Sequence, residues 1–315
     1  MKKVNSKSKE KDPLLEDVGE DLNEIKYNII YLTHGKKHFL EETYFSILSL
    51  CNQMKDIIFK IHIYTDKPDY FEAFHHLDIQ FNLLTEEKIN HWKGENQYLH
   101  RLKINVMLDI SENYPNEIYL FLDSDTFITA PINSVLERIK PEQFVLDYDE
   151  GLLSQKKRTH IRNLYEVLLN NKQLNIEMDP ELRMWNSGVI GLNGVNSEIL
   201  KEILETTDAL SELLKSHILE QFAFAYHFQK NGKVQKACDT IHHYWYFKEM
   251  RGVIQEFFKK NKFLPLEEQI ANVERWNPQK IGIEKWNYKQ SSFWSKFLFR
   301  LTHFRKWKAN LDHIH

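Results

Sequence analysis

The chain has 315 residues, of which 42% are hydrophobic and 13% aromatic, so it has enough apolar material for one large domain or two small ones. Its 42 basic and 45 acidic side chains give a formal net charge of -3, which argues against a dedicated nucleic-acid-binding protein. The two cysteines, Cys51 and Cys238, form neither a disulfide framework nor a zinc knuckle and fit a reducing cytoplasm.

The N-terminal segment has no targeting or membrane-spanning pattern. The basic start is followed by no apolar run, so we expect no secretory signal peptide. No stretch reaches the roughly 18 apolar residues of a membrane span. Residues 1–25 carry charges of both signs and are expected to form a mobile tail, with the ordered domain beginning near Lys26. We therefore expect a cytoplasmic protein, soluble or peripheral at the inner face of the membrane.

From residue 26 onward, short apolar runs alternate with segments of helical periodicity. Strands are predicted at residues 27–32, 59–65, 78–84 and 118–122, and helices at 38–54 and 96–110. Later come a helix at 160–171, a strand at 188–192, and helices at 197–214 and 219–229, whereas 235–246 mixes polar and aromatic residues and receives no assignment. This alternation predicts an α/β fold with a mostly parallel central sheet flanked by helices.

The sharpest motif is Asp123-Ser124-Asp125, which directly follows the apolar run 118–122. A buried strand therefore delivers two carboxylates at its carboxyl end, the edge at which open α/β sheets bind ligands. Two close carboxylates repel each other unless a cation lies between them. Oxygen ligands suit Mg²⁺ or Mn²⁺, which also bind diphosphates. A solvated Asp-Ser-Asp turn is the alternative interpretation.

Other segments follow the order of motifs in a known family. They are residues 30–33, 63–66, 185–190, 220–221 and 242–244. Together with the Asp-Ser-Asp motif they resemble the DxD glycosyltransferases of the GT-A fold, most closely glycosyltransferase family 8 and its bacterial relatives. The resemblance covers residues 27–250 and implies a catalytic domain at 26–250. Residues 251–315 match no motif and are expected to form a C-terminal extension.

The resemblance implies a metal-dependent hexosyltransferase with a nucleotide-sugar donor, UDP-hexose first, and a glycan, lipid or protein acceptor. It also implies retention of the anomeric configuration. The implied ligands of Mn²⁺ or Mg²⁺ are Asp123, Asp125 and His243. The implied donor contacts are Thr33, Asp66, Arg101, Lys103, Asp123, Ser124 and Gly188. The implied catalytic residues near the sugar are Asn186, Glu220 and Gln221. Ser187 and Glu220 depart from the family's usual Ala and Asp, which leaves the donor sugar and acceptor open.

His243 is preferred over His242 as a metal ligand because it directly precedes Tyr244, which matches the family's order. If this stretch is extended, the two imidazoles point to opposite sides and only one can reach the ion.

Several of these residues also have a plainer interpretation. Arg101 and Lys103 are two residues apart, cannot share a helix face, and each fits a solvated helix surface. Asp66 fits a turn, and Glu220 fits a helix N-terminus where a carboxylate is stabilised without function. At Gly188 we expect the missing side chain to let a ligand approach closely. Asp147, Asp149 and Glu150 are expected to form a solvated acidic loop.

Two other functions fit the motif. A phosphohydrolase of the haloacid dehalogenase type also places Asp-x-Asp after an apolar strand, although normally near the start of its chain. A non-catalytic nucleotide-sugar-binding protein on the same fold is the second, and the intact carboxylate pair argues against it.

Residues 285–315 mix basic and aromatic side chains, with Asp312 as the one acid. The basic residues are Lys285, Lys289, Lys296, Arg300, Arg305, Lys306 and Lys308, and the aromatic ones include Trp286, Phe293, Trp294, Phe297, Phe299, Phe304 and Trp307. This mixture suits an anionic lipid surface. A terminal helix packed on the domain is an equally good interpretation.

Overall fold

The computed structural model describes residues 26–54, 59–155, 158–291, 307 and 309. The predicted N-terminal tail, residues 1–25, lies outside this part of the chain.

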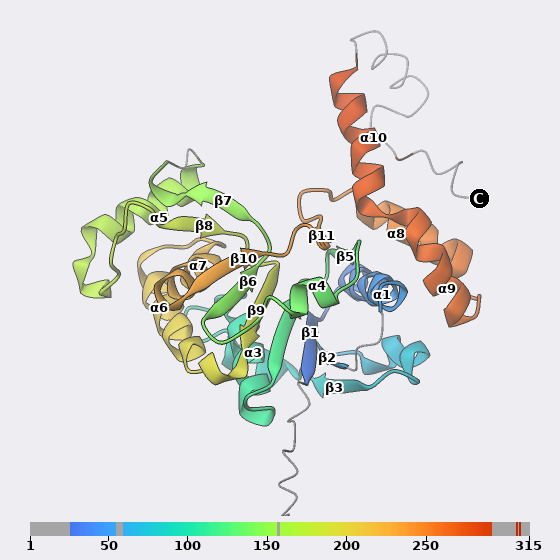
Figure 1. Ribbon diagram of the computed structural model, residues 1–315, viewed down its shortest axis with the longest axis horizontal. Helices are drawn as coiled ribbons and strands as arrows, with labels where there is room; N and C mark the ends of the chain where they lie inside the picture. The colour runs from blue at the N-terminus through green and yellow to red at the C-terminus, as the bar shows by residue number, and fades with distance from the viewer. Residues whose placement is uncertain (1–25, 55–58, 156–157, 292–306, 308, 310–315) are drawn as a thin grey trace, which may run out of the picture.

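A seven-stranded sheet forms the centre of the molecule, with the strand order β10-β6-β9-β4-β1-β2-β3 (Figure 1). Its strands are β1 (Tyr27–Thr33), β2 (Phe59–Thr65), β3 (Ile79–Leu83), β4 (Ile118–Leu122), β6 (Gln143–Leu146), β9 (Val189–Asn193) and β10 (Lys233–Lys236). All neighbouring pairs are parallel except those that involve β9, which runs antiparallel to both β4 and β6. The predicted α/β class with a mostly parallel sheet is therefore confirmed.

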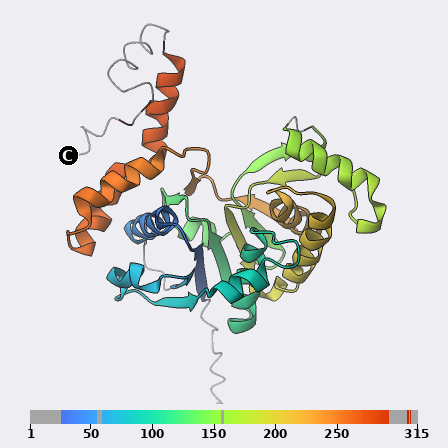
Figure 2. The same ribbon diagram turned by 180° about the vertical axis from the view of Figure 1, so that it is seen from behind.

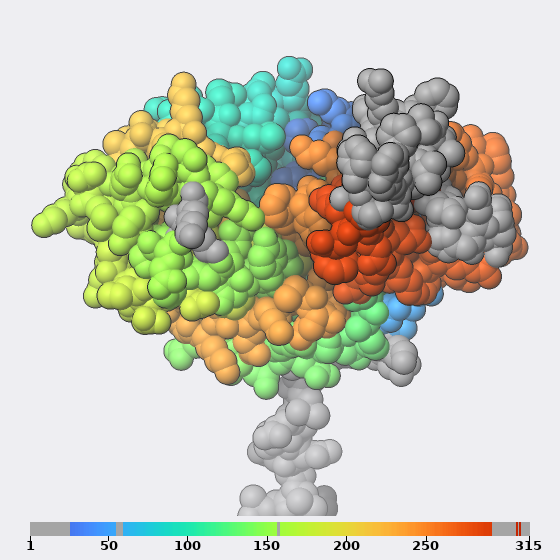
Figure 3. Space-filling model, turned by 90° about the horizontal axis from the view of Figure 1, so that it is seen from above, coloured from blue at the N-terminus to red at the C-terminus, as the bar shows by residue number. Residues whose placement is uncertain are grey.

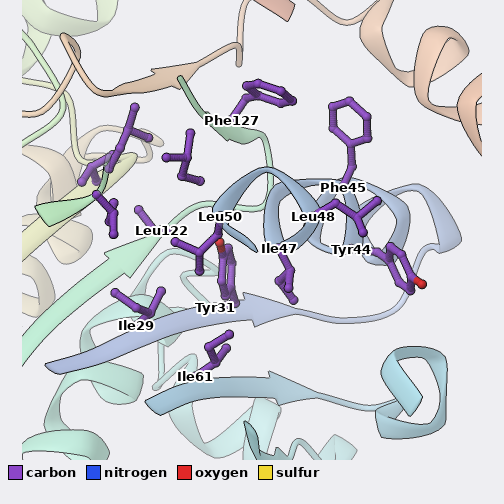
Figure 4. Close-up of a cluster of buried hydrophobic side chains, with 14 of the residues drawn as sticks. Ile29, Tyr31, Tyr44, Phe45, Ile47, Leu48, Leu50, Ile61, Leu122 and Phe127 are labelled. Carbon is purple, nitrogen blue, oxygen red and sulfur yellow. The ribbon is translucent and has the colours of Figure 1, made fainter. Parts of the chain in front are cut away.

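Helices cover both faces of this sheet. Because successive strand residues point to opposite faces, Ile29 and Tyr31 pack with α1 (Lys37–Asn52), while Ile30 packs with α3 (Arg101–Asn113). The first face also holds α8 (Met250–Asn261) and α9 (Leu266–Val273), and the second holds α6 (Ile199–Leu213) and α7 (Leu219–Asn231). Figure 4 shows Tyr31, Phe45 and Leu48 in the first of these two cores.

Two small antiparallel sheets flank the central one. One pairs β5 (Thr126–Ile128) with β11 (Ile241–His243), and the other pairs β7 (Asp149–Leu152) with β8 (Arg183–Trp185). The chain between β7 and β8 contains η2 (Leu153–Gln155), α5 (Thr159–Asn170) and η3 (Lys172–Leu174). We call residues 149–185 the lobe; it lies on the opposite side of the molecule from α10 (Pro278–Gln290), as both ribbon views show (Figures 1 and 2).

The lobe has a small apolar core of its own. Leu153, Ile161, Leu164 and Leu168 cluster there with residues of α7, among them Phe222. The small core of the lobe therefore packs against the rest of the molecule through α7.

The remaining short elements are η1 (Pro68–Phe74), α2 (Glu86–Trp92), α4 (Asn133–Leu136), η4 (Gly194–Asn196) and η5 (Glu274–Trp276). The helix predicted from residue 96 begins instead at Arg101, because Gly94 and Gln97 adopt positive φ angles of 67° and 51° in the turn before it. Within the described ranges, no helix is both long enough and apolar enough to span a membrane.

The C-terminal extension predicted for residues 251–315 starts with helices that pack on α1. Met250, Val253, Ile254 and Phe257 of α8 are buried in the same core as Phe45. This first part of the extension therefore contributes to the stability of the domain. Most of the basic and aromatic segment beyond Ser291 lies outside the described residues.

Candidate functional site

The Asp-Ser-Asp motif forms the turn between β4, which ends at Leu122, and β5, which begins at Thr126. The Thr126 hydroxyl donates to the carbonyl oxygen of Asp123 at 2.8 Å and is itself 2.9 Å from the Ser46 hydroxyl of α1. Ser49 of the same helix accepts a hydrogen bond of 2.9 Å from the backbone N–H of Ile128. The buried serines of α1 therefore fix the turn at the carboxyl end of the central strand.

The partner strand β11 brings His243 to this turn. In the antiparallel register His243 lies opposite Thr126 and His242 opposite Phe127. The Nε2 atom of His243 is 3.2 Å from Asp125 Oδ1 and 3.8 Å from Asp123 Oδ2. Donor atoms of Asp123, Asp125 and His243 all lie within 4.8 Å of one another, which is close enough for one ion to bind all three.

The other imidazole nitrogen of His243 contacts two buried side chains on the side away from Asp125. Its Nδ1 atom is 2.9 Å from Asp147 Oδ2 and 3.1 Å from Asn186 Oδ1. An Nδ1–H that donates to a carboxylate leaves Nε2 as a lone-pair donor, and this is how metal-binding histidines are usually oriented. The three residues therefore fit a divalent cation in both donor type and orientation.

The same contacts govern the protonation of the group. Burial lowers the pKa of His243, but Asp125 and Asp147 outweigh it and raise that pKa to about 10. Burial raises the pKa of Asp123, and the neighbouring Asp125 adds to this effect. A proton and a metal ion therefore compete for one position between the carboxylates, and metal binding would release protons.

Gly188 makes room for this imidazole. A Cβ atom at this position would lie 2.0 Å from Nδ1 of His243, a separation that real Cβ atoms do not show. The backbone of Gly188 also accepts from Asp123 N at 2.8 Å and donates to Asn186 Oδ1 at 2.9 Å. The missing side chain thus makes room for His243. A donor contact at Gly188, which also lines the cavity described below, stays a prediction.

Lys103 joins the metal group to a second carboxylate. Its Nζ is 3.1 Å from Asp123 Oδ1, 3.3 Å from Glu220 Oε1 and 2.9 Å from the Ser187 carbonyl oxygen. Burial lowers the pKa of Lys103, but the two carboxylates raise it above its ordinary value, so the amine stays charged. Lys103 donates hydrogen bonds to Asp123 and to the Ser187 carbonyl oxygen, and the carboxylates of Asp123 and Glu220 balance its charge, so little of that charge is left for a phosphate.

Arg101 does not contact the metal group. Its Nε is 2.7 Å from Asp208 Oδ1 and its Nη1 donates to the Trp92 carbonyl oxygen at 2.8 Å. Arg101 and Lys103 therefore lie on different faces of α3, as their spacing requires. A phosphate contact by Arg101 has no support from this placement.

The metal group forms one wall of a cavity of about 190 Å³. Besides the residues already described, its lining includes Glu150, Arg158, His160, His217, Gln221 and Trp245. Gln221 Nε2 donates to Glu150 Oε1 at 3.3 Å, so a hydrogen bond between two lining residues joins the start of α7 to the lobe. Figure 3 views this side of the molecule, with the lobe in yellow-green and α10 in red on opposite sides of it.

Thr33 and Asp66 lie along the same edge of the sheet but do not line this cavity. Thr33 ends β1, and its buried hydroxyl has no hydrogen-bond partner among the described residues. Asp66 follows β2 and accepts from the Gly35 backbone N–H at 3.1 Å. Ser124 is half-buried in the metal turn.

Sequence reasoning missed Asp147, which is not a solvated loop residue. It is 1% exposed and bonded to His243. A signal was available, since Asp147 follows the buried run of β6 just as Asp123 follows that of β4. Glu150, Arg158, His160 and His217 carried no such signal, because they reach the cavity only through the folding of the lobe and of the loop before α7.

Comparisons with known proteins give a fold-level similarity and little sequence similarity. No protein-family model matches the chain, and no curated protein matches it. The solved structures that it resembles include mouse xyloside xylosyltransferase 1 in its apo form, at 13% identity and a TM-score of 0.48, over 68% of this chain and 85% of that one.

Two further solved structures show the same level of similarity. The galactosyltransferase LgtC, solved with donor and acceptor sugar analogs, is 13% identical with a TM-score of 0.47, over 66% of this chain and 72% of that one. The bifunctional glycosyltransferase WbbM is 15% identical with a TM-score of 0.48, and this chain spans 39% of its length. Such partial similarities do not transfer an activity, and membership of family 8 stays a prediction.

Proposed function

We propose that this protein is a metal-dependent glycosyltransferase that moves a hexose from a nucleoside-diphosphate sugar, UDP-hexose first, to a glycan, lipid or protein acceptor. The observation that carries the proposal is the group of Asp123, Asp125 and His243 at the carboxyl end of a central strand, facing a cavity of about 190 Å³. Oxygen and imidazole ligands beside a sugar-sized space suit an ion that holds a diphosphate.

Asp125 and His243 are the ligands most available to the ion, because both oxygens of Asp123 lie within 3.3 Å of Lys103 Nζ. The imidazole favours Mn²⁺ over Mg²⁺. When bound, the metal would neutralise charge that develops on the leaving diphosphate. Asp147 and Asn186 orient His243, so Asn186 acts as a positioning residue.

Glu220 is a cavity-lining carboxylate that Lys103 links to the metal group. It is 1% exposed, lines the cavity, and is held by Lys103 at 3.3 Å. A fixed negative charge in such an enclosed site can stabilise positive charge at the anomeric carbon of the donor. Gln221, held by Glu150, would contact the sugar hydroxyls. Retention of configuration is proposed from the family resemblance alone.

Thr33 and Asp66 would contact the nucleoside. Thr33 ends β1, the strand next to β4, and Asp66 follows β2, the strand beyond it. The buried Thr33 hydroxyl, which lacks a partner among the described residues, would gain one from the ligand.

The test is metal-dependent hydrolysis of a panel of nucleotide sugars, with the released nucleotide measured. We expect one donor to be cleaved in Mn²⁺ and none in excess EDTA. Cleavage of p-nitrophenyl phosphate in place of every nucleotide sugar would instead indicate the phosphohydrolase. Tight nucleotide binding without turnover would indicate a binding protein.

We also propose that residues 285–315 bind an anionic membrane surface at the cytoplasmic face. In the described part, Ile283 and Trp286 of α10 are 57% and 60% exposed. Trp307, in contrast, packs against Phe247 with ring centroids 5.7 Å apart, which favours a packed terminal segment. Co-sedimentation with anionic vesicles that is unchanged by deleting residues 290–315 would refute the proposal.

A further inference from the structure

The lining of the cavity includes nitrogen-rich side chains that do not belong to the metal group. Arg158 and His160 come from the lobe, and His217 comes from the loop before α7. The rings of His160 and His217 are 5.0 Å apart, and the guanidinium of Arg158 lies 6.0 Å from the ring of Trp245. These side chains come from separate segments and converge on one corner of the cavity.

The charge in this corner is available to a ligand. Among the described residues that line the cavity, the permanent cations are Lys103 and Arg158, and the charge of Lys103 is balanced by the carboxylates of Asp123 and Glu220. Arg158 approaches Glu150 Oε2 at 3.7 Å, which is beyond hydrogen-bonding distance, and its side chain is 54% exposed. A guanidinium carries five N–H donors, so it keeps donors for an anion.

Glu150 is the acid next to Arg158, and its carboxylate is buried. Its side chain is 7% exposed and accepts hydrogen bonds from Gln221 and Tyr148 at 3.3 Å and 3.4 Å. It therefore neutralises part of the charge of Arg158 without occupying the exposed side of the guanidinium. The result is a corner with a net capacity to donate hydrogen bonds.

We propose that the acceptor of this enzyme carries a phosphate or carboxylate group, bound by Arg158, His160 and His217, with its sugar ring against Trp245. The inference rests on the proposed function, because it assigns the acceptor side of the same cavity. A planar guanidinium binds both kinds of anion in a bidentate manner, and Trp245 is 38% exposed and offers an aromatic face.

No hydrogen bond or ion pair among the described residues joins Arg158, His160 or His217 to the metal group, which supports this assignment. The donor diphosphate would lie at the metal wall, where Asp123, Asp125 and His243 are. An acceptor anion that bound there would compete for the ion. A second anion site elsewhere in the cavity lets a charged acceptor bind while the metal stays with the donor.

The experiment measures binding of three probes to the full-length chain in EDTA, so that neither metal nor donor takes part. The probes are a neutral methyl hexoside, the corresponding hexose 6-phosphate and the corresponding hexuronate, measured by calorimetry. We expect at least one anionic probe to bind about tenfold more tightly than the neutral sugar, which corresponds to about 1.4 kcal/mol. The tighter of the two anions identifies the acceptor chemistry.

Arg158→Gln should abolish the preference for the anion. Arg162→Gln is the matched control, because it makes the same charge change about one helical turn further along α5 and does not line the cavity. Equal binding of the neutral sugar, or an equal effect of the two variants, would overturn the proposal. Because the assay needs no donor, its outcome is independent of whether any nucleotide sugar is hydrolysed.

Discussion

The two walls of the cavity are built in different ways. The metal wall consists of buried or half-buried groups with several partners each: His243 contacts four side chains, and Lys103 contacts three groups. The wall formed by the lobe has exposed side chains with few partners, such as Arg158. The first is attached to the central sheet and α1, and the second to a small separate core on α7.

This difference separates two tasks. Groups that hold a metal and a reacting bond need fixed geometry, and burial within the main core supplies it. Groups that choose an acceptor can differ between related enzymes if their supporting structure is independent of that core. Substitutions in one wall should therefore change its function and leave the other wall intact.

The largest effect is expected from Asp125→Asn. The variant loses the carboxylate most available to the ion, so nucleotide-sugar hydrolysis should fall by roughly a thousandfold while the fold persists. Asp149→Asn, in the lobe, is the matched control, because its carboxylate pairs with Arg183 at the surface. Comparable losses in both variants, measured at saturating Mn²⁺, would contradict the division into two walls.

The next effect distinguishes the two adjacent histidines. His243→Gln should weaken Mn²⁺ affinity by roughly 10–100-fold, because Nε2 faces the carboxylates. His242→Gln should leave that affinity unchanged, since His242 lies beside Tyr246 and not beside the acids. Titration of Mn²⁺ against hydrolysis rate checks both variants, and the reverse ranking would move the ligand by one residue.

Much of the metal wall could be predicted from the sequence because it depends on local patterns. An apolar run followed by Asp123 and Asp125 places carboxylates at a strand end. Strand alternation explains why only one of His242 and His243 can face the carboxylates, and the choice of His243 came from its place before Tyr244 in the order of the family it resembles. The order of strands and helices predicts the mostly parallel sheet for the same reason.

The remaining features depend on contacts between distant segments. Nothing near Gly188 in the sequence indicates that its missing side chain makes room for His243, 55 residues later. The antiparallel direction of β9 and the placement of Arg158 follow from tertiary packing, which periodicity does not encode. The residues of the lobe that line the cavity could therefore not be predicted from the sequence.

A smaller effect, on stability, comes from Gly188→Ala. The added Cβ would overlap the imidazole of His243, and overpacking of this kind costs about 1–3 kcal/mol of folding free energy. The double variant Gly188→Ala/His243→Ala should recover part of that loss, because the clashing ring is gone. Gly252→Ala in α8 is the control, since its Cβ meets no atom within 4 Å. Thermal unfolding measures all three, and the absence of recovery in the double variant would contradict the assigned contact.

The smallest expected effect tests what burial of charge costs α1, the helix whose serines fix the metal turn. Glu42 of α1 is 3% exposed and accepts from Arg251 Nε at 2.9 Å, while its second oxygen has no partner in the described part of the chain. Burial raises the pKa of Glu42 from 4.5 to about 7, against the lowering effect of Arg251. The folded protein therefore holds this proton more tightly than the unfolded chain does.

The sign of the pH dependence follows from that difference. The folded state is favoured by this proton at acidic pH, and the contribution is lost as pH rises from about 4.5 through 7. Glu42→Gln cannot lose the proton, so its free energy of unfolding should fall less than that of the wild type between pH 5 and pH 8, by roughly 1–3 kcal/mol. The loss of the charged partner of Arg251 would offset part of this gain at pH 8. Urea unfolding at the two pH values measures the slope. A wild-type slope no steeper than that of the variant would show that Glu42 is ionised in the folded protein without a penalty, and that the buried face of α1 tolerates this charge.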